Sequence, residues 1–445
     1  MKIHFVGIGG IGMSSLALHC RLRGDDVYGS DICGNEQIDI LRSAGIHVFI
    51  GHSYENWLHP DVVVHTPAVH SDNPEILRAR AEGVKVMSRS EFLRSILDGV
   101  TQFAITGSDG KTTTTAMVAH CLKSLGEDPT VFLGGMHKSL EFYNYRSGKG
   151  PYVYELDESQ PEFSAFSPDF LIITNARQDH LENYDNNENF YRSCFENLAR
   201  KTRRAVITFS EDKNTSNLGT HTFGRSSGTC KLLSRERKGL LQIASIELAG
   251  RQYELKLKVP GEHNVLNAMA VLTLLWSIGY NVDAVLTALE DFVSTHRRFD
   301  VTVLNERDRT YVVDDYAHTP DEIRSLIAAA KEVFPEEKKV VIFQPHRYTR
   351  LLREDGNFAK ALKDADEIYV TEVYGAFEKA IPQISAKMIV DGLISHGKQA
   401  RYFPKLEELL EAFKPQEKTV YLFVGAGDII KVSQRFVQNY SQKRR

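Results

Sequence analysis

The stretch TQFAITGSDGKTTTTAMVAHCL, residues 101 to 122, decides how the central part of this chain folds. An apolar strand pattern precedes the glycine turn, and an apolar helical pattern follows it directly. This is the setting of a phosphate-binding loop, in which backbone N–H groups at a helix N-terminus bind phosphate oxygens. The general consensus G-x-x-x-x-G-K-[ST] asks for glycine where this chain has Ile105. The alternatives are therefore a shortened phosphate loop and a glycine turn capped by threonines.

If the loop binds ATP, its side chains have distinct roles. We expect Lys111 to neutralise charge on the outer phosphates and the Thr112 hydroxyl to reach a magnesium ion. Asp109 is unfavourable beside phosphates, because like charges repel, unless it faces away or meets the metal. The predicted ATP-binding residues of the loop are Gly107, Ser108, Asp109, Gly110, Lys111, Thr112 and Thr113.

Composition restricts the class of protein. The 445 residues allow about three domains, and 42% hydrophobic with 25% charged residues is an ordinary globular balance. A net charge of -4 gives no general attraction to nucleic acid or to an anionic membrane. Five scattered cysteines without a C-x-x-C pair favour neither a disulfide framework nor a zinc site. We expect a cytoplasmic protein with no signal peptide, no membrane insertion and no nucleic-acid partner.

Short strand patterns alternate with helical patterns such as that of Glu322 to Val333, which predicts an α/β fold with parallel, doubly wound sheets. The strand candidates are Ile3 to Val6, Val62 to Val64, Phe103 to Thr106, Phe170 to Thr174, Ala205 to Phe209, Tyr311 to Val313, Val340 to Phe343, Glu367 to Val370 and Val420 to Val424. We predict three domains: a Rossmann-like domain over 1–99, a central phosphate-loop ATPase-type parallel sheet with a small antiparallel insertion over 100–296, and a Rossmann-like domain over 297–445.

A second glycine loop, Gly7 to Gly12, lies between a strand and a helix near the start of the chain. Asp31 ends the next strand, about twenty residues on, as in a dinucleotide-binding fingerprint. The same geometry binds any diphosphate. The two interpretations are a nicotinamide cofactor and a nucleotide-sugar diphosphate.

Acidic and histidine side chains follow two strands of the central domain. Glu155 ends one strand, and His180 follows another. Because carboxyl ends of neighbouring parallel strands converge, both would lie near Thr112 and complete a magnesium site. Histidine is a poor ligand for magnesium, so the alternative is a loop histidine with ordinary hydrogen bonds.

Four more clusters of polar, aromatic and basic residues occur at strand or helix ends. They are residues 261–267, 296–299, 314–320 and 344–350. In the last of these, Arg347 and Arg350 follow a strand, and a pair of guanidinium groups there can bind a carboxylate. Together the four clusters predict a shared site.

The order of these motifs resembles the Mur ligases, ATP-dependent amide-forming enzymes of peptidoglycan synthesis. The matching segments, in order, are GIGGIGM, TGSDGKTTT, ELDES, TNARQDHL, HNVLNA, RRFD, DDYAH and FQPHRYTR, and they run essentially end to end. The shortened loop is the family's own version of the phosphate loop. The resemblance implies that ATP phosphorylates a muramyl carboxylate and that an amino-acid amine then attacks the acyl phosphate. It is closest to members that join L-alanine to UDP-N-acetylmuramate.

The same resemblance implies roles for individual residues. The catalytic residues would be Lys111, Glu155 and His180. The ligands of Mg2+, or alternatively Mn2+, would be Thr112, Glu155 and His180. His263, Asn264 and Asn267 would border adenine, Arg298 the γ-phosphate, and Asp315 the ATP ribose. The uridine diphosphate end would contact Gly9, Gly10, Ile11, Gly12, Asp31 and His52. Alanine would be surrounded by Tyr316, His318, Arg347 and Arg350.

Some positions depart from the pattern of the alanine-adding members. Those members have histidine where this chain has Asp109 and Thr319, and DYAHTPD resembles members that add diaminopimelate or lysine. FQPHRYTR favours alanine. No lysine occurs between His180 and Lys201, so the carbamylated lysine of some relatives is not expected. The other classes of function left open are an NAD-dependent oxidoreductase and a nucleotide-binding regulator without chemistry.

Overall fold

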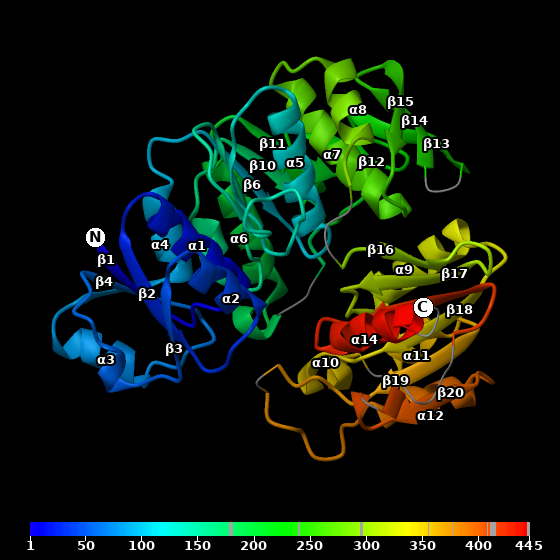
Figure 1. Ribbon diagram of the computed structural model, residues 1–445. Coiled ribbons are helices and arrows are strands. Elements are labelled where there is room, and N and C mark those ends of the chain that lie inside the picture. Colours follow the sequence, from blue (N-terminus) through cyan, green and yellow to red (C-terminus); the bar gives the residue numbers. More distant parts are fainter. Residues whose placement is uncertain are drawn as a thin grey trace. The chain divides into compact units, whose positions relative to one another are not determined.

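Three β-sheets with their flanking helices form the computed structural model (Figure 1). The structure describes residues 1–177, 181–238, 241–293, 297–354, 356–376, 378–406, 408–409 and 415–442. The chain forms two compact units. The first consists of Met1–Glu236, Ile243–Leu257 and Asn264–Phe292, and the second of Arg237–Gln242, Lys258–His263 and Val293–Arg445. The predicted α/β class with mostly parallel sheets is confirmed, and the domain boundaries at residues 99 and 296 stay predictions.

The first sheet has five parallel strands in the order β3-β2-β1-β4-β5. Its strands are β1 (Lys2–Val6), β2 (Asp26–Asp31), β3 (His47–Ile50), β4 (Val62–His65) and β5 (Lys85–Ser88). Its helices are α1 (Ile11–Leu22), α2 (Glu36–Ser43), η1 (Tyr54–Asn56), α3 (Pro74–Ala81) and α4 (Arg89–Ile96). The strand order reverses beside β1, and α/β sheets bind ligands at the carboxyl ends of strands at such a point. The first glycine loop leaves β1 there.

The second sheet has ten strands in the order β15-β14-β13-β12-β11-β10-β6-β9-β7-β8. Its strands are β6 (Gln102–Thr106), β7 (Thr130–Phe132), β8 (Tyr145–Arg146), β9 (Tyr152–Glu155), β10 (Phe170–Ile173), β11 (Ala205–Phe209), β12 (His221–Gly224), β13 (Cys230–Lys238), β14 (Leu241–Leu248) and β15 (Arg251–Leu257). Its helices are α5 (Lys111–Ser124), η2 (Pro161–Ala165), η3 (Leu181–Tyr184), α6 (Glu188–Lys201), η4 (Ser216–Leu218), α7 (Glu262–Ser277) and α8 (Val282–Glu290). All five residues of β6 are buried, as expected for a parallel strand covered on both faces.

The small antiparallel insertion predicted within the central domain extends this sheet at one edge. β12 pairs in parallel with β11 and β13. Between β14 and β15 the chain turns through Ala249 (φ 49°) and Gly250 (φ 80°). Two consecutive residues with positive φ are the mark of a type I′ turn, which joins antiparallel strands. The antiparallel character of the insertion is thus carried by the β14–β15 hairpin.

The third sheet, in the second unit, has the order β16-β17-β21-β18-β19-β20, with only β16 antiparallel to its neighbour. Its strands are β16 (Asp300–Asn305), β17 (Thr310–Asp315), β18 (Lys338–Phe343), β19 (Glu367–Thr371), β20 (Ala400–Phe403) and β21 (Thr419–Val424). Its helices are α9 (Pro320–Val333), α10 (Tyr348–Arg353), α11 (Asn357–Leu362), α12 (Lys387–Ser395) and α14 (Ile429–Gln442). The carboxyl ends of β17 and β18 carry two of the polar clusters found in the sequence.

One apolar core joins the first two sheets within the first unit. Side chains of the first sheet, such as Phe5, belong to the same buried cluster as Tyr154 of the second. A buried hydrogen bond of 3.0 Å also joins His19 Nδ1 of α1 to the Tyr145 hydroxyl of β8. All five cysteines are described, and each is a free thiol. Within the described ranges, no helix is both long enough and apolar enough to cross a membrane.

Candidate active site

The phosphate loop occupies the four residues between β6, which ends at Thr106, and α5, which begins at Lys111. Gly107 has φ 127° and Gly110 has φ 81°, conformations that L side chains rarely adopt. A Cβ atom at Gly107 would collide with the Thr174 hydroxyl, and one at Gly110 would lie 2.7 Å from Asn267 Oδ1. Both positions therefore require glycine, and the strand, tight turn and helix expected from the sequence are present.

The Lys111 ammonium is surrounded by acceptors. Its Nζ lies 2.6 Å from the Gly107 carbonyl oxygen, 3.3 Å from that of Ser108 and 2.7 Å from Glu158 Oε2. An ammonium group has three N–H donors, so these three acceptors can use all of them. Burial raises the pKa of Glu158 to about 7 despite the attraction of Lys111. A bound phosphate would have to replace at least one of these acceptors.

Asp109 does not oppose a phosphate in the way its charge suggests. Its carboxylate forms an ion pair of 2.7 Å with Arg177 Nη2. The Thr174 hydroxyl donates to the Asp109 carbonyl oxygen at 2.5 Å, which holds the backbone of the loop. The carboxylate thus faces a guanidinium group from the loop after β10, and this neutralises the repulsion expected from the sequence.

Two of the three predicted metal ligands meet in the structure. The Thr112 hydroxyl donates to Glu155 Oε2 at 3.1 Å, and the Gly134 N–H donates to Glu155 Oε1 at 2.6 Å. Hydroxyl and carboxylate oxygens are the ligands that Mg2+ prefers, with nucleotide phosphates and water completing its octahedron. His180 lies outside the described residues, so its role stays a prediction. Among the residues described, no three His, Cys, Asp or Glu side chains form a metal-binding group.

The predicted uridine diphosphate residues converge at the carboxyl ends of β1 and β2. The Gly9 N–H donates to Asp31 Oδ2 at 2.8 Å. His52 Nδ1 lies 2.9 Å from the Ser30 hydroxyl, beside Asp31. Gly10 is the N-cap of α1, which begins at Ile11 and Gly12. The backbone N–H groups at the start of α1 are therefore available to an anion.

The sequence patterns did not identify two further residues of this region. Asn35 donates from Nδ2 to the Gly9 carbonyl oxygen at 3.1 Å. The Arg89 guanidinium lies against Gly12, with Nη1 2.7 Å from where a Cβ atom of that glycine would be. Arg89 directly follows β5, so its position at the carboxyl end of a parallel strand could have singled it out. It brings to the loop a guanidinium group that also pairs with Asp157 Oδ2 at 3.0 Å.

The predicted adenine residues lie together near the start of α7. Asn267 is 7% exposed and lies against Gly110 of the phosphate loop. Asn264 is also buried, and the ring of the preceding residue, His263, covers Gly261. The structure therefore brings Asn267 to the phosphate loop and leaves the adenine contacts as predictions.

In the second unit, Asp315 and Arg298 lie around the end of β17. Both carboxylate oxygens of Asp315 accept backbone N–H groups at 2.7 Å, from Phe299 and Ala317, and burial raises the pKa of the carboxyl. Asp315 is thus a structural acceptor for the turn after β17, besides its predicted contact with ribose. The Arg298 guanidinium lies 5.3 Å from the centroid of the Tyr316 ring.

The four predicted alanine-binding residues lie at the ends of β17 and β18. The rings of His318 and His346 are 5.7 Å apart, and Arg350 Nη1 is 3.1 Å from His346 Nδ1. Tyr316 and His318 are neighbours at 5.4 Å. Arg347 has φ 72° and ψ 132°, a strained conformation for an arginine that costs about 1–3 kcal/mol. His346, for which no role was predicted, lies among them.

We predict that this histidine pair makes stability depend on pH. Burial lowers the pKa of His318 to about 4 and that of His346 to about 3, from 6.5. As the pH falls, these histidines are protonated in the unfolded chain at a higher pH than in the folded chain. Their contribution to the stability of the folded chain is therefore complete above pH 6.5 and is lost as the pH falls toward 4. Between pH 7 and pH 4.5 each histidine accounts for about 2–3 kcal/mol.

The measurement is urea unfolding of the full chain at pH 7 and pH 4.5. His318→Gln is expected to lose less stability between these pH values than the wild type. His47→Gln, which changes an exposed histidine, is the control. An equal pH dependence in all three proteins would contradict the prediction.

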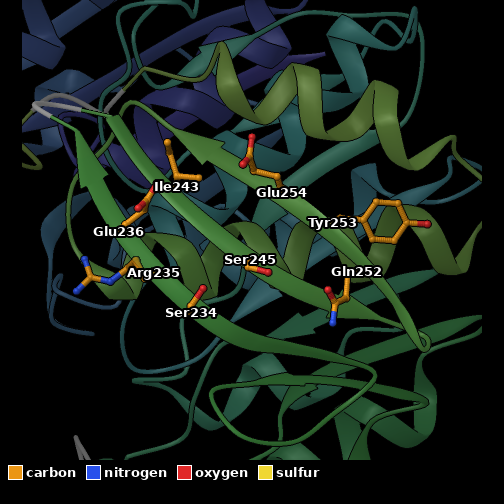
Figure 2. Close-up of a pocket in the computed structure, with 8 residues that line it drawn as sticks. All are labelled: Ser234, Arg235, Glu236, Ile243, Ser245, Gln252, Tyr253 and Glu254. Atoms are coloured by element: carbon orange, nitrogen blue, oxygen red, sulfur yellow. The ribbon is translucent and has the colours of Figure 1, made fainter.

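A hollow of about 550 Å³ lies elsewhere, on the sheet formed by β13, β14 and β15. Figure 2 shows its eight lining residues: Ser234, Arg235, Glu236, Ile243, Ser245, Gln252, Tyr253 and Glu254. Charges of both signs line it, and no residue predicted for the site is among them. A second cavity of about 340 Å³, beside His120 of α5, also lacks such residues. Neither contributes to the candidate active site.

Comparison with known proteins gives matches along most of the chain. The family models are the Mur ligase family catalytic domain over residues 2–101, the Mur ligase middle domain over 105–275, and the Mur ligase glutamate ligase domain over 297–427. The chain is 68% identical to a UDP-N-acetylmuramate–L-alanine ligase of Pseudothermotoga lettingae, over 100% of both chains. It is 58% identical to the protein of that name from Thermotoga petrophila, covering 100% of this chain and 98% of the relative.

Solved structures agree with the sequence comparison. The crystal structure of the UDP-N-acetylmuramate-alanine ligase of Thermotoga maritima matches with a TM-score of 0.92 and 55% identity, over 100% of both chains. A murein peptide ligase of Psychrobacter arcticus, 20% identical, has the same fold with a TM-score of 0.71 over 99% of this chain and 98% of that one. With all three family models matched in order along its length, this chain belongs to the Mur ligase family.

Proposed function

We propose that this protein is an ATP-dependent ligase that joins L-alanine to the carboxylate of UDP-N-acetylmuramate, in peptidoglycan precursor synthesis. Two observations carry the proposal. The lysine of the phosphate loop, Lys111, pairs with the buried carboxylate of Glu158. Over its whole length, the chain also matches a relative that is named for this reaction. ATP and UDP-linked sugars are cytoplasmic compounds, so we expect the protein to act in the cytoplasm.

The reaction proceeds in two steps. A carboxylate oxygen of the sugar acid attacks the γ-phosphorus of ATP, ADP leaves, and an acyl phosphate forms. The neutral amine of alanine then attacks the acyl carbon, inorganic phosphate leaves with the former carboxylate oxygen, and the nitrogen loses a proton to the solvent as the amide forms. Lys111, at the N-terminus of α5, stabilises charge on the transferring phosphoryl group. Main-chain N–H groups at the start of α5 hold the other phosphate oxygens.

A divalent cation fits the donor set beside the loop. Thr112 and Glu155 supply hydroxyl and carboxylate oxygens, a set suited to Mg2+ or Mn2+, and His180 would add a nitrogen. When bound, the ion neutralises charge on the phosphates. Glu155 is held for this task by the Gly134 N–H, so its carboxylate is oriented before the ion arrives.

The remaining contacts follow the predicted roles. The start of α1, with Asp31 and His52, holds the uridine diphosphate end, and Arg89 adds a positive charge there. Arg298 contacts the γ-phosphate, Asp315 the ribose, and Asn267 the nucleotide from its place at the loop. The contacts with alanine come from Tyr316, His318, Arg347 and Arg350.

The identity of the amino acid is tested by a panel of substrates. ADP release is measured with UDP-N-acetylmuramate, ATP, Mg2+ and one amino acid at a time. We expect the highest kcat/KM with L-alanine, and a kcat/KM at least about tenfold lower with lysine or diaminopimelate. Small pockets discriminate an added methylene by about 10–200-fold, so glycine and serine are the close competitors. A preference for lysine or diaminopimelate would contradict the proposal, and NADH turnover would favour an oxidoreductase.

A further inference from the structure

Glu322 makes more contacts than its place in helix α9 requires. Thr319 is the N-cap of this helix, and the two residues form a capping box. The Thr319 N–H donates to Glu322 Oε2 at 3.1 Å, and the Glu322 N–H donates to Thr319 Oγ1 at 3.4 Å. A capping box needs only these two hydrogen bonds. Here Oε2 also accepts the N–H of His318 at 2.9 Å.

The other oxygen of the same carboxylate reaches a cation. Glu322 Oε1 lies 3.4 Å from Arg298 Nη1, and Oε2 lies 3.3 Å from His318 Nδ1. Burial alone would raise the pKa of Glu322, but His318, Arg298 and the two backbone N–H groups hold it well below its usual range. Glu322 is therefore a carboxylate at neutral pH.

Arg298 is in turn fixed on two sides. Burial alone would lower its pKa, but Glu322 and Asp315 hold it above the usual value. Its guanidinium lies over the ring of Tyr316, two residues before His318. The Arg298 side chain is 30% exposed and that of Glu322 is 17% exposed, so the arginine keeps an accessible part while its carboxylate partner is mostly covered.

We propose that Glu322 is a positioning residue that fixes Arg298 and the turn from Tyr316 to His318 in one arrangement. The inference rests on the proposed function, in which Arg298 contacts the γ-phosphate of ATP and the turn contacts alanine. Glu322 itself touches neither substrate. It holds the two substrate-contacting groups together, so that loss of its charge weakens the binding of both ATP and alanine.

The chain offers a matched control for the helix-capping role. Ser88 and Glu91 form the same capping box at the start of α4, with the Ser88 N–H donating to Glu91 Oε2 at 2.7 Å and the Glu91 N–H donating to Ser88 Oγ at 3.2 Å. Within the described part of the chain, Glu91 has no ion pair with Lys, Arg or His, unlike Glu322. Glu91→Gln therefore removes the charge from a capping box without disturbing a bound guanidinium.

The test is the steady-state kinetics of Glu322→Gln, Glu91→Gln and the wild type, with each substrate varied. Glutamine keeps an acceptor oxygen for the cap but loses the charge that holds Arg298. We expect Glu322→Gln to raise the KM for ATP and the KM for alanine by about tenfold each, the effect of one hydrogen bond to a charged group. The KM for UDP-N-acetylmuramate is expected to stay within about twofold, and Glu91→Gln to behave as the wild type.

A purely structural role gives a different result. If Glu322→Gln matches Glu91→Gln in every KM, or raises all three KM values equally, the positioning role is wrong. If the wild type and Glu91→Gln release no ADP with the complete substrate set, the proposed function has failed instead.

Arg298→Met keeps the test decisive should Glu322→Gln not fold. If Glu322 links the two groups, Arg298→Met raises the KM for alanine as well as that for ATP. In the Glu322→Gln/Arg298→Met double variant, the effects of the two changes on the KM values are not additive, because both changes break the same interaction between Glu322 and Arg298. An Arg298→Met variant that changes only the KM for ATP would overturn the inference.

Discussion

Replacement of Lys111 with methionine is expected to lower kcat/KM for ATP by about 10³-fold or more, the largest effect of any single change in the loop. Methionine has nearly the length of lysine but no charge, so the γ-phosphoryl group loses a cation that stabilises it during transfer. The change also leaves Glu158 without its ion pair of 2.7 Å. Because burial already raises the pKa of Glu158 to about 7, this carboxyl can take up a proton.

The measurement is ADP release with the complete substrate set, together with a thermal melt to show that the variant is folded. Lys123→Met is the matched control, because Lys123 is an exposed lysine in the last turn of the same helix. It is expected to keep wild-type kcat/KM. A folded Lys111→Met protein with kcat/KM within tenfold of wild type would show that this lysine does not stabilise the transferring phosphoryl group.

Replacement of Glu75 with alanine is expected to give the largest loss of stability, about 3–5 kcal/mol. Glu75 is 1% exposed. Its Oε1 accepts from the Ser53 N–H at 3.2 Å and from Asn56 Nδ2 at 2.6 Å, and its Oε2 lies 2.5 Å from the Ser30 hydroxyl and 3.1 Å from His4 Nε2. Alanine would leave these buried polar groups without their acceptor.

The same network makes the stabilisation by Glu75 depend on pH. Burial alone would raise the pKa of Glu75, but the His4, His52 and Ser30 side chains hold it well below the ordinary 4.5. A carboxyl with a lowered pKa stabilises the folded chain above pH 4.5, and this stabilisation is lost as the pH falls below that value. Glu75→Ala should therefore be nearer to wild type in acid than at pH 7.

Urea unfolding followed by tryptophan fluorescence measures this difference, because both tryptophans, Trp57 and Trp276, lie in the first unit. The control is Glu36→Ala, at an exposed glutamate of α2, which should change the unfolding free energy by no more than about 0.5 kcal/mol. A loss below about 1 kcal/mol for Glu75→Ala would mean that the buried network is dispensable.

Local sequence patterns were enough to predict the elements that carry the site. Each strand candidate lies on a strand of the structure, because central parallel strands are continuous apolar runs. The meeting of Thr112 and Glu155 was also predictable, since β6 and β9 are adjacent parallel strands. Helix α9 begins two residues before the predicted Glu322, because Thr319 caps it and Pro320 suits its first position.

The partners of the predicted residues could not be read from the sequence. Glu158 lies 47 positions from Lys111, and Arg177 lies 68 from Asp109, so each pair exists only because the sheet brings two loops together. Nothing in the sequence around Glu75 distinguishes it from other charged residues at the start of a helix, yet it is buried among groups from β1, β2 and the loop after β3. Hydrophobic periodicity carries no information about such contacts.

The central claim is that the loop beginning at Gly107 presents ATP to the carboxylate of the sugar acid, which is activated as an acyl phosphate. The most direct measurement uses UDP-N-acetylmuramate labelled with ¹⁸O in its carboxylate, incubated with ATP, Mg2+ and L-alanine. The account predicts that each inorganic phosphate released carries one labelled oxygen, because the carboxylate oxygen leaves with the phosphoryl group. Unlabelled phosphate formed in step with the amide product would contradict it.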